Sequence, residues 1–163
     1  GDVLNQKLCI YAHAYNPVCD SHSIPTGENA SVEGTPMDFL KMKEIGQDID
    51  ADFEQLQFTG GYDHNFVTDN YAPGNVRRIA EAYCEETGIA MSVSTDCPGV
   101  QFYAGNFIEN EAGKNGHTYG KRDGFCLETQ AEPNAVNEEA FHSPILETGE
   151  IYHSVTAYRF YIK

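Results

Sequence analysis

The sequence predicts an all-β protein, and three observations lead to that prediction. Apolar residues recur mostly at every second position, the period that brings side chains to one face of a strand. The chain contains 10 Tyr and 9 Phe, which favour strands. Long segments rich in Gly, Pro and Asn separate the apolar runs, as is usual in β-sandwiches whose loops carry a site.

The expected strands follow one another along the whole chain. In residues 7–15, aliphatic side chains at every second position alternate with mostly aromatic or thiol side chains. This pattern predicts a strand with both faces at least partly covered. Residues 76–84 and 89–95 flank a short polar connector that ends in Gly88, a signal for a β-hairpin. The remaining expected strands are residues 100–106, 125–129 and 151–162, the last being the densest in β-formers.

Helix is expected in one place only. Residues 36–49 carry apolar side chains near helical spacing, but Gly46 and the acidic residues after it weaken the pattern, so we expect a turn or two. Long loops are expected at residues 16–36, 60–65, 110–124 and 130–150. No repeat, low-complexity tract or linker divides the chain, so residues 1–163 are expected to form one unit.

The charge balance excludes two classes of partner. With 10 Lys and Arg against 25 Asp and Glu, the formal net charge is −15. Binding to a nucleic-acid backbone or an anionic membrane surface requires clustered basic residues. No segment approaches the ~18 uninterrupted apolar residues of a transmembrane helix. We therefore expect neither a nucleic-acid nor a membrane partner.

The five cysteines indicate a reducing compartment. They are odd in number and scattered, with no Cys-x-x-Cys pair, unlike a disulfide scaffold or a structural zinc site. We expect reduced, buried thiols and a cytoplasmic location, because the first residues also lack the layout of a signal peptide. Gly1 in place of Met suggests a processed end. The six His show no metal-ligand spacing, so no metal site is expected.

Carboxylates are the best candidates for chemistry. The chain has no Gly-x-Ser-x-Gly elbow and no P-loop. Glu128 follows Phe125 and Leu127 in an otherwise apolar strand, and desolvation there would shift a carboxyl pKa toward the range useful for proton transfer. The alternative, which composition alone favours, is a solvent-facing Glu on an alternating strand. Asp63 lies where a loop enters a strand.

Eight motifs add a family resemblance. They are Ile24-Pro25-Thr26-Gly27-Glu28, Gly34-Thr35-Pro36-Met37-Asp38-Phe39, Gly61-Tyr62-Asp63-His64-Asn65-Phe66, Pro98-Gly99-Val100-Gln101-Phe102-Tyr103-Ala104-Gly105-Asn106-Phe107, Gly124-Phe125-Cys126-Leu127-Glu128-Thr129-Gln130, Pro133-Asn134-Ala135-Val136-Asn137, Ser143-Pro144-Ile145-Leu146 and Gly149-Glu150-Ile151-Tyr152. Their order resembles that of the galactose mutarotases, or aldose 1-epimerases, from about Leu8 to Phe160. The family fold is a large antiparallel β-sandwich, a supersandwich. The resemblance implies that residues 1–163 are the C-terminal portion of such a domain.

The resemblance also implies a reaction and its residues. Aldose 1-epimerases interconvert the α and β anomers of a free hexose such as galactose or glucose by acid/base ring opening, without a cofactor. By motif position, Glu128 resembles the general base, and Asp63 and Gln101 resemble sugar ligands. The family's general acid is a His in an N-terminal half that this sequence does not contain. His64 adjoins Asp63 and is an alternative acid, although the family does not use that position in this way.

Three functions therefore stay open. The chain is either part of an aldose 1-epimerase that needs the missing half for turnover, or a carbohydrate-binding module without turnover. The third function is a self-associating half-domain, because open sheet edges are prone to pairing. The expected partners are an aldohexose and either the missing N-terminal half or a second copy of the chain.

Overall fold

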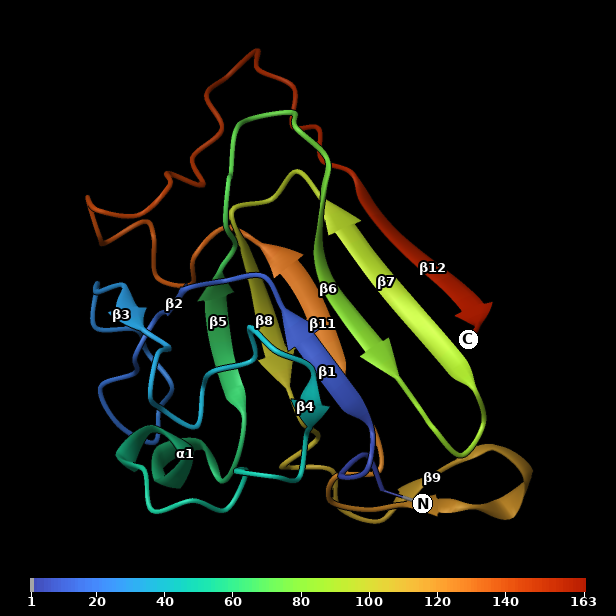
Figure 1. Ribbon diagram of the computed structural model, residues 1–163. Coiled ribbons are helices and arrows are strands. Elements are labelled where there is room, and N and C mark those ends of the chain that lie inside the picture. The colour runs from blue at the N-terminus through green and yellow to red at the C-terminus, as the bar shows by residue number, and fades with distance from the viewer. Residues whose placement is uncertain (1) are drawn as a thin grey trace.

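The computed structural model describes residues 2–163 as two five-stranded antiparallel sheets packed face to face (Figure 1). The first sheet has the order β12-β7-β6-β1-β4, built from β1 (Lys7–Ile10), β4 (Lys43–Glu44), β6 (Arg77–Tyr83), β7 (Ile89–Thr95) and β12 (Thr156–Ile162). The second has the order β11-β8-β5-β2-β3, built from β2 (Ala14–Tyr15), β3 (Ala30–Ser31), β5 (Asp63–Val67), β8 (Gly99–Tyr103) and β11 (Cys126–Gln130). The predicted all-β antiparallel sandwich is confirmed.

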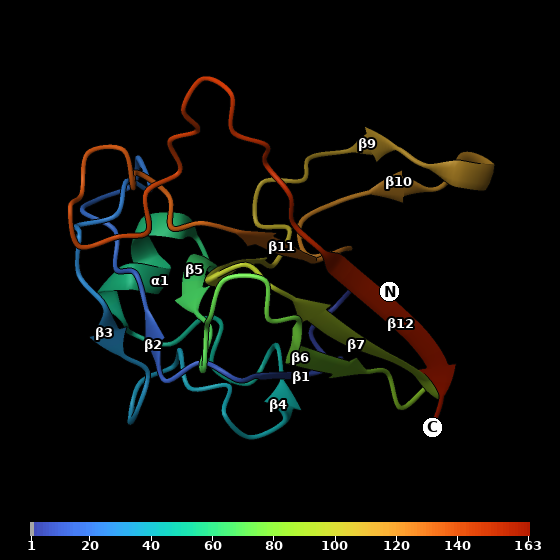
Figure 2. The same cartoon turned by 90° about the horizontal axis from the view of Figure 1, so that it is seen from above.

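Short elements complete the described chain. A ribbon of β9 (Glu111–Ala112) and β10 (Thr118–Tyr119), joined by a 3₁₀ turn at Lys114–Gly116, projects from the sandwich (Figure 2). The helix α1 (Glu54–Thr59) precedes β5 and ends at Gly60, which adopts a left-handed conformation. Within residues 2–163, no helix has the length and apolar character needed to cross a membrane.

The core fills the space between the two sheets. Its centre is a cluster of four fully buried aromatic rings from two loops, β5 and β8, with contacting centroids 5.0–6.5 Å apart: Phe39, Tyr62, Phe66 and Phe102. Leu8 and Ile10 of β1 close it from the first sheet. Because strand side chains alternate between faces, the residues between these core positions point out of the sandwich.

Two predictions of secondary structure were accurate. The hairpin is present as β6 and β7, and the amide of Gly88 donates to the carbonyl of Cys84 to close its turn. The strands expected at residues 100–106 and 125–129 are also present, as β8, which starts one residue earlier and ends three residues earlier than expected, and as β11, which is shifted by one residue.

Four predictions were wrong in detail. Residues 7–15 are two strands, because the chain leaves β1 for the second sheet and there becomes β2. Residues 36–49 contain turns and β4 instead of helix, and their apolar side chains reach the core from separate turns. Residues 60–65, expected as a loop, contain the start of β5. Residues 151–155 are not part of the last strand.

Candidate active site

The three residues singled out in the sequence lie on one face of the second sheet. Asp63 begins β5, Gln101 is the middle residue of β8, and Glu128 is the middle residue of β11. The strand register places Glu128 directly opposite Gln101, while Asp63 is a diagonal neighbour of Gln101. Their side chains alternate with core residues such as Phe102, so all three point away from the core.

Asp63 and Gln101 are in direct contact. The Gln101 side-chain amide donates a hydrogen bond to Asp63 Oδ1 at 2.8 Å. Burial raises the pKa of the Asp63 carboxyl, the bond from Gln101 lowers it, and the nearby charge of Glu128 raises it again, with a net rise. The pair thus presents a carboxylate and an amide oxygen side by side, a set that can accept hydrogen bonds from sugar hydroxyls.

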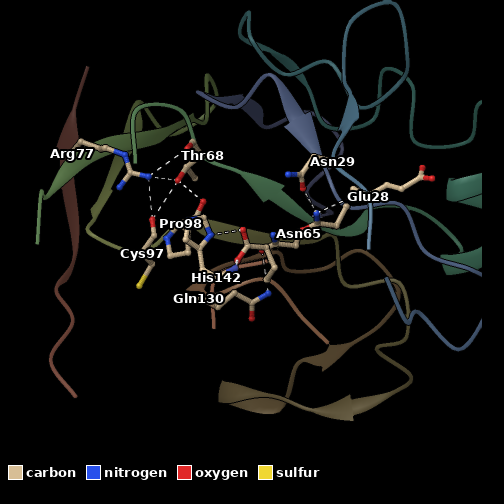
Figure 3. Close-up of polar contacts among 11 residues, drawn as sticks. Glu28, Asn29, Asn65, Thr68, Arg77, Cys97, Pro98, Gln130 and His142 are labelled. Carbon is tan, nitrogen blue, oxygen red and sulfur yellow. Dashed lines mark hydrogen bonds and ion pairs between the residues drawn. The ribbon is translucent and has the colours of Figure 1, made fainter. Parts of the chain in front are cut away.

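An amide network continues from this pair across the sheet, and Figure 3 shows its part around Asn65, Gln130 and Asn29. The Gln130 side-chain amide donates to both Gln101 and Asn65 at 3.3 Å. Asn65 in turn donates to the Oδ1 atom of Asn16 at 2.7 Å, and Asn16 donates to Asn29 at 2.7 Å. Such a network holds the orientation of Gln101, because its Oε1 already has a donor.

A pocket of about 380 Å³ lies over this face. It is lined by Ser23, Asp63, Gln101, Tyr103, Phe107, Glu128, Gln130 and Pro133. Tyr103 and Phe107 stack with ring centroids 6.3 Å apart at one side, and Phe107 is 62% exposed. A polar floor beside an exposed aromatic pair suits a sugar, which has both hydroxyls and an apolar ring face.

The sequence predicted that the Glu128 carboxyl is desolvated, and this prediction is wrong, because the Glu128 side chain is exposed. Phe125 and Leu127 do pack on the core, as their apolar character predicts. However, neighbours along a strand point to opposite faces, so these side chains do not cover the Glu128 carboxylate. The alternative of a solvent-facing Glu128 is therefore the correct one. The register of β5, β8 and β11 nevertheless places Glu128 beside Asp63 and Gln101.

His64 is not at this site. Its side chain lies in the core at 1% exposure, in edge contact with the Tyr15 ring, on the face of β5 opposite to Asp63. Burial lowers the pKa of His64 to about 4, so the imidazole is neutral at neutral pH. The alternative of His64 as a replacement acid is therefore wrong.

The sequence did not single out the supporting residues. Gln130 donates to both Gln101 and Asn65, and Gly99 leaves room for Asn65, because a Cβ at that position would lie 2.5 Å from the Asn65 Oδ1 atom. The sequence did carry a signal for such supporting residues, because Gln101 and Gln130 lie at outward-pointing positions of two strands with alternating side chains. It is weak, because outward polar residues are common on any sheet.

The thiol prediction is only partly accurate. All five cysteines are free, but only Cys9 and Cys97 are buried, and Cys19 and Cys126 are exposed. Cys126 lies two residues before Glu128 and therefore shares its outward face.

Comparison with known proteins identifies the family. The family model described as Aldose 1-epimerase matches residues 1–159, almost the whole chain. This chain belongs to the aldose 1-epimerase family. It is 39% identical over 160 residues to the galactose mutarotase of Bos taurus, covering 98% of this chain and 44% of the relative. It is 35% identical over 162 residues to the aldose 1-epimerase of Escherichia coli (strain K12), covering 98% and 46%.

Solved structures agree with that assignment. An aldose epimerase homologue from C. elegans superposes with a TM-score of 0.81 at 26% identity, covering 99% of this chain and 47% of the homologue. The galactose 1-epimerase of Lactobacillus acidophilus shares the fold, with a TM-score of 0.70 at 24% identity. This epimerase-family chain thus spans less than half the length of the relatives it matches.

Proposed function

We propose that this chain is the C-terminal portion of an aldose 1-epimerase domain and carries the base and two sugar ligands of an anomer-interconverting site. The observation that carries the proposal is the placement of Asp63, Gln101 and Glu128 on one face of three adjacent strands, around one pocket. Membership of the family supports the reaction class.

The proposed chemistry requires two proton transfers. Glu128 takes the proton from the anomeric hydroxyl while an acid protonates the ring oxygen, and the bond between C1 and that oxygen breaks to give the open-chain aldehyde. Rotation about C1–C2 and the reverse transfers close the ring as the other anomer. No electrons are gained or lost. Each positioned acid or base contributes about 10²–10⁴-fold to such a step.

Asp63 and Gln101 serve as sugar ligands in this proposal. Asp63 accepts from hydroxyls, and Gln101 offers an amide that both donates and accepts. The bond between them sets the spacing of the two groups before a sugar arrives, which reduces the entropy lost on binding. We infer an aldohexose as the substrate class, and five unpaired cysteines support a cytoplasmic location.

Sugar binding without turnover is the second candidate, and one observation favours it. The residues that line the pocket include no His, and His64 lies in the core, so the described chain places no imidazole acid beside Glu128. A site with a base and ligands but no matched acid would bind a hexose and catalyse its ring opening poorly.

Polarimetry with freshly dissolved α-galactose tests the proposal, with galactose calorimetry beside it. We expect saturable binding by the chain alone, and faster mutarotation when an N-terminal portion of a relative is added. Binding without any acceleration in that mixture would support the binding module. An absence of saturable binding in both samples would contradict both candidates.

A further inference from the structure

Gln130 lies on the same outward face as the proposed site residues, and the strand register gives its position. It is two residues beyond Glu128 on β11 and pairs with Gly99 of β8, two residues before Gln101. Asp63 of β5 pairs with a residue on the other side of Gln101. Asp63, Gln101 and Gln130 therefore lie on one diagonal across three strands, a spacing that long side chains can bridge.

Two chains of hydrogen bonds end on the side-chain amide of Gln130, and each chain has a fixed direction. The first begins at the backbone carbonyl of Glu28, which can only accept, so Asn16 turns its Nδ2 atom toward that oxygen at 3.0 Å. The Oδ1 atom of Asn16 then accepts from Asn65 at 2.7 Å. The Oδ1 atom of Asn65 is left to accept from the Nε2 atom of Gln130 at 3.3 Å.

The second chain begins at Asp63, whose ionised carboxylate also only accepts. Gln101 turns its Nε2 atom toward Asp63 at 2.8 Å and its Oε1 atom toward Gln130, which donates to it at 3.3 Å. Both chains thus present an oxygen to Gln130, and the amide group of Gln130 supplies one hydrogen to each. Turning this amide over would set its oxygen against two acceptor oxygens, so its orientation is fixed from both sides.

The Oε1 atom of Gln130 is therefore directed away from the network. Figure 3 shows the nitrogen of this side-chain amide turned toward Asn65 and its oxygen turned away. In the described part of the chain, residues 2–163, no donor is hydrogen-bonded to this oxygen. An oxygen held in this way can accept a hydrogen bond from a bound molecule without breaking another one.

Gln130 lies at the limit of the pocket that contains Asp63 and Glu128. It lines this pocket and also a neighbouring pocket of about 470 Å³, which lies on the side away from Asp63. Residues two apart on a strand are separated by about 6.6 Å, a distance that one hexose can span. A sugar whose anomeric hydroxyl lies at Glu128 therefore has other hydroxyls within reach of Gln130.

We propose that Gln130 is a third sugar ligand, whose Oε1 atom accepts a hydrogen bond from a hydroxyl that Asp63 does not bind. This inference rests on the proposed function. Because both N–H groups of Gln130 are already used, the residue acts only as an acceptor and requires a hydroxyl hydrogen at one position of the sugar. Gln130 therefore determines specificity, since a sugar without that hydroxyl leaves the oxygen without a donor.

The test measures the affinities of galactose and of its monodeoxy derivatives, each lacking one hydroxyl, for the full chain by NMR titration. We expect Gln130→Met to weaken galactose binding about three- to tenfold, the usual effect of one neutral hydrogen bond. One deoxy derivative should bind the unaltered chain more weakly by a similar factor. Gln130→Met should not weaken the binding of that derivative any further, because the variant and the derivative remove the same hydrogen bond.

Gln47→Met is the matched control. Gln47 also donates to a neighbour, Asp48 at 3.2 Å, but it lies outside the pocket, so this variant should leave every affinity unchanged. If Gln130→Met weakened all the sugars by one common factor, Gln130 would serve only as a support for Gln101. That result overturns the inference, as does an unchanged affinity for galactose, and both leave the proposed function standing.

The NMR signals of the unaltered chain supply a measurement that does not depend on the folding of a variant. Galactose should shift the side-chain amide signals of both Gln101 and Gln130, and one deoxy derivative should shift those of Gln101 alone. Signals of Gln130 that move equally with every derivative overturn the inference. An absence of saturable galactose binding by the unaltered chain contradicts the proposed function, and the inference then fails with it.

Discussion

The amide of Gln101 reaches across two adjacent strands and donates to Asp63 Oδ1 at 2.8 Å. Two effects oppose each other at this carboxyl. Burial raises the pKa of Asp63, and the hydrogen bond from Gln101 lowers it. The contact therefore keeps Asp63 ionised, and able to accept from sugar hydroxyls, at a lower pH than burial alone would allow.

Gln101→Leu removes that donor. We expect the pKa of Asp63 to rise further, and galactose affinity to fall about tenfold, since a hydrogen bond to a charged group contributes about 1.5–3 kcal/mol. Carboxyl titration by NMR and calorimetry measure the two effects. Gln57→Leu is the matched control, because Gln57 donates to Asp52 at 2.6 Å far from the pocket. An unchanged or lower pKa of Asp63 would refute this account of the pair.

Glu128→Gln tests the base. In a mixture with the N-terminal portion of a relative, we expect mutarotation of α-galactose to slow by about 10²–10⁴-fold, because the amide cannot take the anomeric proton. Galactose affinity should change little. Glu111→Gln, an exposed Glu on the projecting ribbon, should leave the polarimetric rate unchanged. A rate near that of the unaltered chain for Glu128→Gln would show that the base lies elsewhere.

His64 predicts a pH dependence of folding. The pKa of the buried imidazole falls from 6.5 to about 4, so the unfolded chain binds the proton more tightly than the folded one. The stability contributed by neutral His64 is complete above pH 6.5 and is lost as the pH falls toward 4, by roughly 3 kcal/mol. Urea unfolding between pH 4 and 7 measures the slope.

His64→Phe should flatten that slope, because Phe has no proton to bind, and it should leave galactose affinity intact. His117→Phe, at an exposed position, should keep the slope of the unaltered chain. If His64→Phe abolished sugar binding while the protein remained folded, the separation of His64 from the pocket would be wrong.

Gly61 lies two residues before Asp63, in a backbone conformation and a space that favour glycine. It has a φ of +137°, and a Cβ there would lie 2.3 Å from the Oδ1 atom of Asn106. Asn106 is fixed by bonds to the carbonyls of Thr59 and Tyr62, so it cannot move freely. We expect Gly61→Ala to lower the free energy of unfolding by about 2–4 kcal/mol in urea denaturation.

Gly124→Ala is the control for that substitution. A Cβ on Gly124 would meet nothing within 4 Å, and its φ lies outside the left-handed region. We expect a change in unfolding free energy within about 0.5 kcal/mol. Equal losses for the two variants would show that neither the contact with Asn106 nor the positive φ of Gly61 sets the effect.

Local sequence patterns predicted those strands whose pairing partner is the next strand along the chain. The hairpin of β6 and β7 is such a case, because Gly88 supplies the turn and alternation supplies both strands. Residues 7–15 show the limit, since alternation continues through a segment that crosses from one sheet to the other. Nothing local marks the crossing, because it depends on which strands pair with β1 and β2.

By itself the sequence determined the fold class, the family and the identity of Asp63, Gln101 and Glu128 as candidates. Those features follow from periodicity and from motif order, which are properties of the chain alone. Only the tertiary structure decided that His64 is buried, that Glu128 is exposed, and that apolar Phe160 is uncovered. Exposure depends on what packs across a sheet, and that partner comes from residues distant in sequence, or from another polypeptide.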